Sequence, residues 1–170
     1  VFEPHNQIAR ARNAGAAGAT GDWLVFVDAD SHPSAGLFAD VAEAIQGGQC
    51  LGGGATVEFE TEVAWAKRAT VLWNTVSRVF RYAAGSFVFC EAAAFRALGG
   101  FSLELYVSEE IEFSRRLKKL ARAQGRQVMI LTRHPLLTSG RKIKLYTFRE
   151  HLHLLGRLII RGRRQRDHCF

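Results

Sequence analysis

The sequence predicts an α/β domain, in which helices cover a largely parallel sheet, and three observations support this prediction. A chain of 170 residues that is 48% hydrophobic and 23% charged is large and apolar enough for one domain with its own core. The run WLVFV, Trp23 to Val27, contains no polar residue, which is typical of a strand buried on both faces. Segments with helical periodicity alternate with such short apolar runs along the chain.

The first part of the chain predicts helix, strand, helix and strand in that order. Residues 5–22 are rich in small side chains, with Ile8, Arg12 and Ala16 near one helical face and glycines at the end. After the strand at 23–27, Pro33 and Ser34 begin a helix that runs to about Ile45. Its expected inner side chains are Leu37, Phe38, Val41 and Ile45. Residues 47–60 predict a turn and a strand that ends in solvent or at an edge.

The second part predicts a helix over 63–82, a short buried strand in AGSFVFC, a helix in EAAAFRAL and a turn at GGF. A clear helix follows from Ser108, its N-cap candidate, to Gly125, with acidic residues at its start and basic residues at its end. RQVMIL predicts the last strand. Residues 142 to about 162 predict a final amphipathic helix.

The formal net charge of +7 is concentrated at the end of the chain. Residues 1–140 hold 14 Lys and Arg and 14 Asp and Glu, whereas residues 141–170 hold 9 and 2. We therefore expect two parts, a domain at 1–140 and a basic amphipathic helical tail at 141–170. The tail would suit an anionic membrane surface, and no recognised nucleic-acid motif accompanies its charge, so no nucleic-acid partner is expected.

Cysteine usage and hydropathy suggest where the protein works. Cys50, Cys90 and Cys169 are widely spaced and form no zinc pattern, which fits a reducing compartment. No signal-peptide pattern and no apolar run near 18 residues is present. We therefore expect a cytoplasmic protein. Peripheral attachment to the membrane surface is a further expectation.

Two acidic clusters carry candidate chemistry. Asp28 and Asp30 follow the buried strand at the edge where open α/β sheets bind ligands, and two such carboxylates can share a divalent cation. Capping the next helix is the alternative role for this pair. Glu109 and Glu110 begin the helix at 108–125, where they complement the helix dipole. Because adjacent helical residues diverge by about 100°, one would be a base and the other an anchor.

The order of these motifs resembles the family 2 glycosyltransferases of the GT-A fold. The resemblance rests on ARARNAGAAGATGDWLVFVDADS, then AGSFVFCEAAAFRALGGF, then SEEIEFSRRLKKL, and covers residues 4 to 131. It implies a Rossmann-like, mostly parallel mixed sheet flanked by helices. It further implies that 1–140 is the C-terminal two-thirds of a GT-A domain, truncated before its nucleotide-binding strands.

The resemblance also implies roles for individual residues. Asp28 and Asp30 would be the Asp-any-Asp pair, with Asp30 the direct ligand of Mg or Mn on the diphosphate of a nucleotide sugar. Arg12 would lie near the donor nucleotide. Glu110 would be the general base, with Glu109 as its competitor, although the family usually has Asp at this place.

Further residues extend the expected site. His134 would be an additional metal or diphosphate contact, or a solvated loop residue beside Pro135. Ser139, Arg141 and Lys142 would close over the diphosphate. The acidic pair that usually follows GGF is absent, and only Glu104 remains as an acceptor contact.

The implied activity is inverting transfer of a sugar from a nucleotide-diphosphate sugar to a hydroxyl of a glycan or lipid-linked acceptor. The alternative is a non-catalytic fragment, or a peripheral membrane-binding module that uses the basic C-terminal helix. Haloacid dehalogenase phosphatases also have an Asp pair after a buried strand, but their pattern has Thr or Val at the position where this chain has His32.

Overall fold

The computed structural model describes residues 1–60, 63–83, 85–106 and 108–139. Val1–Thr138 form one compact unit, and the predicted tail at 141–170 lies outside the described residues. The helices are Ile8–Gly18 (α1), Ala35–Gln46 (α2), Ala64–Phe80 (α3), Ala92–Ala97 (α4) and Glu109–Ala123 (α5). The strands are Trp23–Val27 (β1), Ser31–His32 (β2), Cys50–Glu60 (β3), Phe87–Glu91 (β4) and Gln127–Ser139 (β5).

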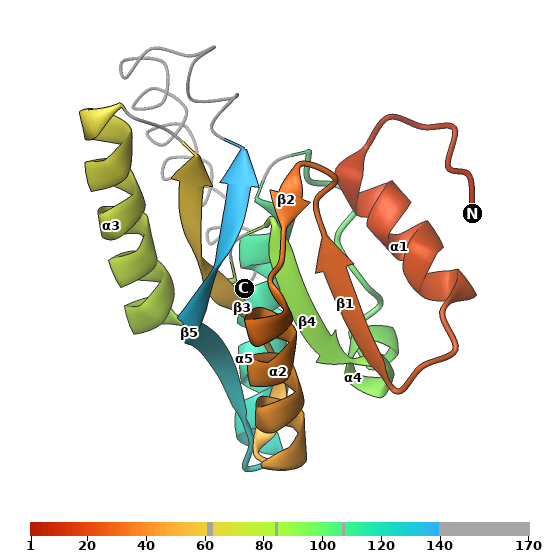
Figure 1. The fold of residues 1–170 in the computed structure, drawn as a ribbon. Coiled ribbons are helices and arrows are strands. Elements are labelled where there is room, and N and C mark those ends of the chain that lie inside the picture. The colour runs from red at the N-terminus through yellow and green to blue at the C-terminus, as the bar shows by residue number, and fades with distance from the viewer. Residues whose placement is uncertain (61–62, 84, 107, 140–170) are drawn as a thin grey trace, which may run out of the picture. The chain divides into compact units, whose positions relative to one another are not determined.

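The five strands form one sheet in the order β1-β4-β3-β5-β2 (Figure 1). The α/β class with flanking helices is therefore confirmed. The expected parallel character is not what the described registers show, because β1 with β4, β3 with β4 and β2 with β5 are all antiparallel. A run of apolar residues favours a strand inside a sheet, but it does not report the direction of the neighbouring strand.

The strand β1 also differs from its predicted burial on both faces. It lies at the edge of the sheet, and Val25 and Val27 are 40% and 39% exposed. Leu24 on its other face is buried. The doubly buried strand is β4, between β1 and β3.

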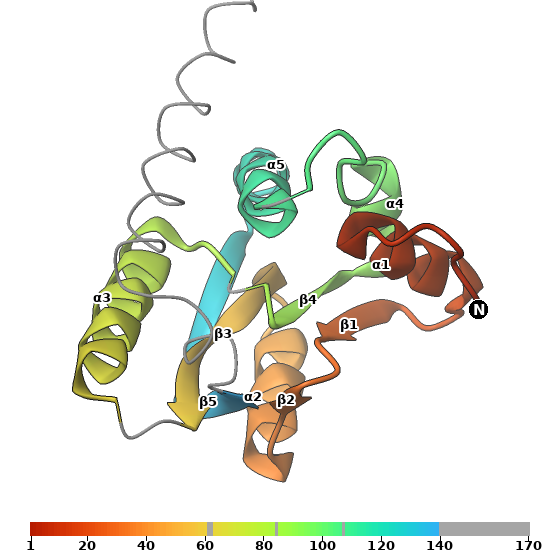
Figure 2. The same ribbon diagram turned by 90° about the horizontal axis from the view of Figure 1, so that it is seen from above.

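Helices cover both faces of the sheet, as Figure 2 shows, with α1, α4 and α5 on one face and α2 on the other. The side chains of β4 alternate between the two faces. Phe87 and Phe89 join the core beneath α2, whereas Val88 and Cys90 join the core beneath α1 and α5. This central strand thus ties the two cores together, and its predicted burial is confirmed.

The helix α2 begins and packs largely as its sequence predicts. Ser34 is the N-cap, and its hydroxyl accepts a hydrogen bond from the Leu37 amide at 3.1 Å. Leu37 and Val41 are buried. Phe38 was expected on the inner side but is 45% exposed, because the apolar face is narrower than the pattern suggested and Asp40 takes an inner position. Among the described residues, no helix is long and apolar enough to cross a membrane.

Candidate functional site

Arg12 of α1 gathers the polar groups at one end of the sheet. Its guanidinium donates to Asp28 Oδ1 at 2.8 Å, to Glu109 Oε1 at 2.9 Å and to the Gly85 carbonyl at 2.6 Å. The side chains of Arg12 and Glu109 are only 10% and 5% exposed. The carbon of the guanidinium also lies 5.3 Å from the centre of the Phe101 ring. Four segments far apart in the sequence therefore meet at this one cation.

The sheet and α5 fix the two acids that Arg12 holds. Asp28 follows β1 directly, and its amide donates to the Ser86 carbonyl at 3.1 Å, just before β4 begins. Glu109 is the first residue of α5, after Ser108 at a φ of 68°. Ser108 is at the predicted N-cap position, but its side chain makes no capping hydrogen bond. Its carbonyl instead accepts from the amides of Ile111 and Glu112.

Glu109 and Glu110 point to different surroundings, as their positions on a helix require. Glu109 is buried and paired with Arg12. Glu110 lies beside Gly85, where an added Cβ would be 3.2 Å from the Glu110 carboxyl carbon. The missing side chain at position 85 therefore leaves the room that the Glu110 carboxyl occupies.

The surroundings of Glu110 raise its pKa to about 7 from an ordinary value of 4.5. Burial is the main cause because it penalises the charged form, and the negative charge of Glu109 adds to it. Asp28 acts in the same direction, while Arg12 opposes the change. A carboxyl group with a pKa near neutrality is suited to exchange protons at physiological pH.

The predicted metal ligands are not brought together as one protein-made centre. Asp28 Oδ1 is taken by Arg12, and Asp30 lies in the turn between β1 and β2, where the structure describes no partner for it. His134 pairs through Nδ1 with Asp40 Oδ2 of α2 at 3.0 Å, and its ring fills the space above Gly36. Within the described residues, no three His, Cys, Asp or Glu side chains could together hold a metal ion.

The remaining predicted contacts are only partly described. Ser139 ends β5, and Arg141 and Lys142 lie outside the described residues. Glu104 is exposed in the loop after the GGF turn, with its amide 3.4 Å from Ser102 Oγ. No contact between Glu104 and the Arg12 cluster is described.

Side chains that the sequence did not single out hold this loop against α1 and α5. The side-chain amide of Asn13 accepts a hydrogen bond from the Phe101 N–H and donates one to the Phe101 carbonyl, both at 2.9 Å. Gln7 donates to the carbonyls of Leu103 and Leu105 at 2.8 and 3.1 Å. On the other side, Arg116 donates to the Leu98 and Gly100 carbonyls. Asn13 directly follows Arg12 in the Ala-Arg-Asn segment, which was the available signal.

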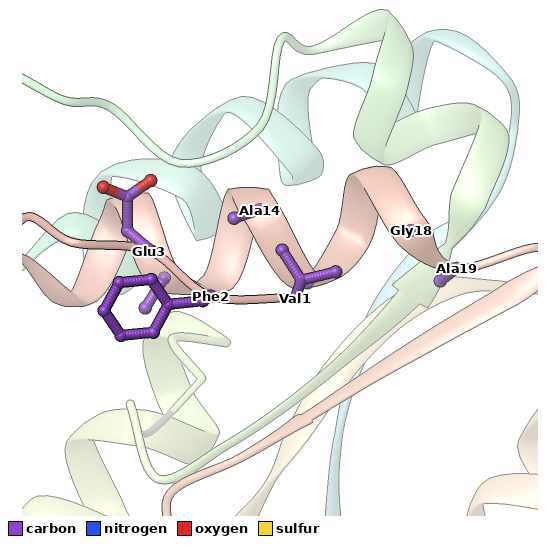
Figure 3. Close-up of a pocket in the computed structure, with 8 residues that line it drawn as sticks. Val1, Phe2, Glu3, Ala14, Gly18 and Ala19 are labelled. Atoms are coloured by element: carbon purple, nitrogen blue, oxygen red, sulfur yellow. The ribbon is translucent and has the colours of Figure 1, made fainter.

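A cleft lies elsewhere, between residues 1–3 and α1 (Figure 3). It measures about 430 Å³ and its lining includes Val1, Phe2, Ala14 and Gly18. Glu3 is the only acidic side chain that lines it, and none of the predicted site residues does. Because none of the predicted site residues lines this cleft, the Arg12 cluster remains the candidate site.

A comparison with known protein families covers part of the Arg12 cluster. The model of the family named Glycosyl transferase family 2 matches residues 1–98. This stretch includes Arg12, Asp28 and Asp30 and ends before Glu109 and Glu110. No curated protein matches the chain. Since the match spans more than half of the 170 residues, the chain belongs to glycosyl transferase family 2.

Proposed function

We propose that the Arg12 cluster belongs to an inverting glycosyl-transfer site in which Glu110 is the general base. Membership of the family supports glycosyl transfer in general. The observation that carries the proposal is the environment of Glu110, a carboxyl group packed beside Gly85 and next to Glu109, with its pKa raised to about 7. Glu109 takes the anchoring role, because Arg12 already occupies its carboxylate.

The proposed step is a single displacement. Glu110 accepts the proton of an acceptor hydroxyl while that oxygen forms a bond to the anomeric carbon of the sugar. The bond from this carbon to the nucleoside diphosphate breaks on the opposite face, and its electron pair leaves with the diphosphate. The acceptor is a glycan or a lipid-linked sugar in this proposal, and the donor is a nucleotide-diphosphate sugar.

Asp28 and Asp30 fit Mg²⁺ or Mn²⁺ as part of a shared coordination shell. Magnesium is commonly held by one or two carboxylates together with substrate phosphates, and the two aspartates that follow β1 would supply such carboxylates. A bound cation would neutralise charge on the diphosphate. Asp30, which has no described partner, is the freer ligand, whereas His134 is engaged with Asp40 and is not included.

Arg12 has a positioning role in this proposal. Three of its hydrogen bonds go to Asp28, Glu109 and the Gly85 carbonyl, so the guanidinium fixes the carboxylates on either side of the proposed site. A contact from Arg12, Ser139 or Arg141 to the donor nucleotide remains a prediction.

The test is sugar transfer by the chain with Mg²⁺ or Mn²⁺ and a panel of nucleotide sugars, read as release of the nucleoside diphosphate. Glu110→Gln should lower the rate by about 100-fold or more, since a positioned base contributes at least that much. Glu112→Gln is the matched control in the same helical turn, because Glu112 pairs with Arg116 instead. Asp30→Asn should raise the metal concentration at which the transfer rate reaches half of its maximum.

The pH profile gives an independent readout. A base must be deprotonated to accept a proton, so the rate should rise through a pH of about 7 and level off above it. Equal rates for Glu110→Gln and Glu112→Gln would contradict the assignment of the base. A rate that does not change with pH across this range would contradict it as well.

A further inference from the structure

A second concave surface lies at the other end of α5, where the helix meets the end of α3 and the start of β5. This cleft measures about 360 Å³. Four cationic side chains line it, and no carboxylate is among its described lining residues. The cations come from three different segments: Arg81, which ends α3, Lys118 and Arg122 of α5, and Arg126 before β5.

The cations of this basic cleft are incompletely neutralised by their neighbours. Lys118 donates to the Phe80 carbonyl at 2.6 Å, and Arg81 donates to the Gln127 side chain at 3.2 Å, so both meet neutral acceptors. Arg126 alone pairs with an acid, Glu91, at 2.6 Å. The structure describes no partner for Arg122.

Two further observations concern the polar groups around this cleft. The Nε atom of Arg126 is buried and has no hydrogen-bond partner among the described groups, and a buried donor without an acceptor is costly. The pKa of Lys118 is lowered, mainly by burial; Tyr82 opposes the change, and the charges of Arg122, Arg115 and Arg81 add to it. The cations around the cleft therefore repel one another, and one buried donor among them has no described acceptor.

Helix ends explain only part of this arrangement. Basic residues in the last turn of a helix interact favourably with its dipole, and this accounts for Arg122. It does not account for Arg126, which lies beyond the end of α5, or for Arg81 at a φ of 51° after α3. Three chain segments converge their cations on one hollow, which is the arrangement expected of an oxyanion site.

We propose that the basic cleft binds a phosphate group, at a site separate from the transfer site. Along α5, the rise of about 1.5 Å per residue places Arg122 roughly 18 Å from Glu110. The cleft also lies outside the residues that the family model matches, except for those at the end of α3. Val79 and Phe80 add an apolar rim to the cleft. The phosphate group would belong either to a soluble compound or to a lipid headgroup, and the experiments below distinguish these two sources.

The experiment is an NMR titration of the full chain with inorganic pyrophosphate, in the presence of a chelator so that no divalent cation supports binding near Asp30. The backbone amides of Lys118, Arg122 and Arg126 should shift, together with the Nε–H signal of Arg126, while those of Glu109 and Glu110 should not. Arg122→Gln should weaken the affinity by about three- to tenfold. Lys119→Gln is the matched control, because Lys119 is in the same turn and does not line the cleft.

Asp30→Asn separates this proposal from the transfer site. If pyrophosphate binding responds to Asp30→Asn and not to Arg122→Gln, the anion belongs to the transfer site and the basic cleft is not a binding site. An equal loss in Arg122→Gln and Lys119→Gln would show attraction by net charge only and would also overturn it. Activity is not needed for this readout, so failure of the proposed function leaves the result unaffected.

Sedimentation with vesicles distinguishes the two phosphate sources. Phosphatidylcholine vesicles with and without phosphatidic acid are compared for the wild-type chain and for Arg122→Gln. Binding that requires phosphatidic acid and weakens in Arg122→Gln supports a lipid headgroup in the cleft. Pyrophosphate binding that is sensitive to Arg122, without such a vesicle effect, supports a soluble phosphate compound.

Discussion

The two ends of α5 differ in how their clustered charges are paired. At its start, Glu109 and Glu110 crowd together with Asp28, and the structure places a buried cation, Arg12, among them. At its end, cations crowd together, and a single carboxylate, Glu91, reaches one of them. At the acidic end a buried cation therefore lies between two of the carboxylates, whereas at the basic end most of the cations have no described carboxylate partner.

This difference has consequences for stability and for titration. The ion pairs of Arg12 join the acidic end of α5 to α1 and to the end of β1, so these side chains contribute to the stability of the fold. The basic end is attached mainly through neutral carbonyl and amide acceptors. Substitutions should consequently cost much more stability at the acidic end than at the basic end.

The largest effect is expected from Arg12→Gln. It removes the cation between two carboxylates, of which Glu109 is 5% and Asp28 29% exposed, and uncompensated buried charge is strongly destabilising. With an allowance for the exposure of Asp28, the free energy of unfolding should fall by about 2–4 kcal/mol at neutral pH. Denaturant unfolding measures this loss.

Arg10→Gln is the control for that substitution, since Arg10 is on the same helix and bonds only to the neutral Gln7 side chain among the contacts described. Its expected cost is below about 1 kcal/mol. Equal costs for the two variants would show that the acidic end is not held by Arg12.

An intermediate effect with the opposite sign is expected from Glu110→Gln. A folded-state pKa of about 7 above an ordinary 4.5 means that the folded chain holds this proton more tightly, so the stability gained from it is lost as pH rises through that window. Glutamine cannot ionise. The variant should match the wild type near pH 4 and exceed it by on the order of 1–2 kcal/mol at pH 8.

Unfolding curves at several pH values check this crossing, with Glu112→Gln as the control. The pair of Glu112 with Arg116 is described at 2.6 Å, so loss of that charge should give no gain at high pH. A pH-independent difference between Glu110→Gln and the wild type would break the assigned origin of the effect.

The smallest effect is expected at the basic end. Arg122→Gln should change the free energy of unfolding by less than about 0.5 kcal/mol, because the side chain is exposed and has no described partner. It should nevertheless raise the pKa of Lys118, since the charge of Arg122 is one of the causes that lower it. NMR titration of the Lys118 side chain measures this change, and Lys119→Gln should leave it unaltered.

Local patterns predicted much of the fold. The start of a helix next to Ser34, the buried strand β4 and the acidic start of α5 follow from short-range rules, and the structure has them where the sequence indicated. Strand direction and neighbours depend on distant segments, which is why the edge position and the antiparallel pairing of β1 were not predicted.

The site divides along the same line. Spacing on a helix predicted that Glu109 and Glu110 would face different surroundings, and they do, whereas the role of either residue as a base stays a prediction. The roles of Gly85 and Asn13 arise only where loops meet α1 and α5, and the one signal in the sequence was the position of Asn13 directly after Arg12. His134 shows the converse, because its place after an apolar run did not reveal its partner Asp40.

The central claim is that the fold makes Glu110 a carboxyl group that titrates near neutrality. The most direct measurement is an NMR titration of the Glu110 side-chain carboxyl carbon in the full chain, assigned by its loss in Glu110→Gln. A pKa of about 7 is the expected result. A pKa at the ordinary value of 4.5 would contradict it.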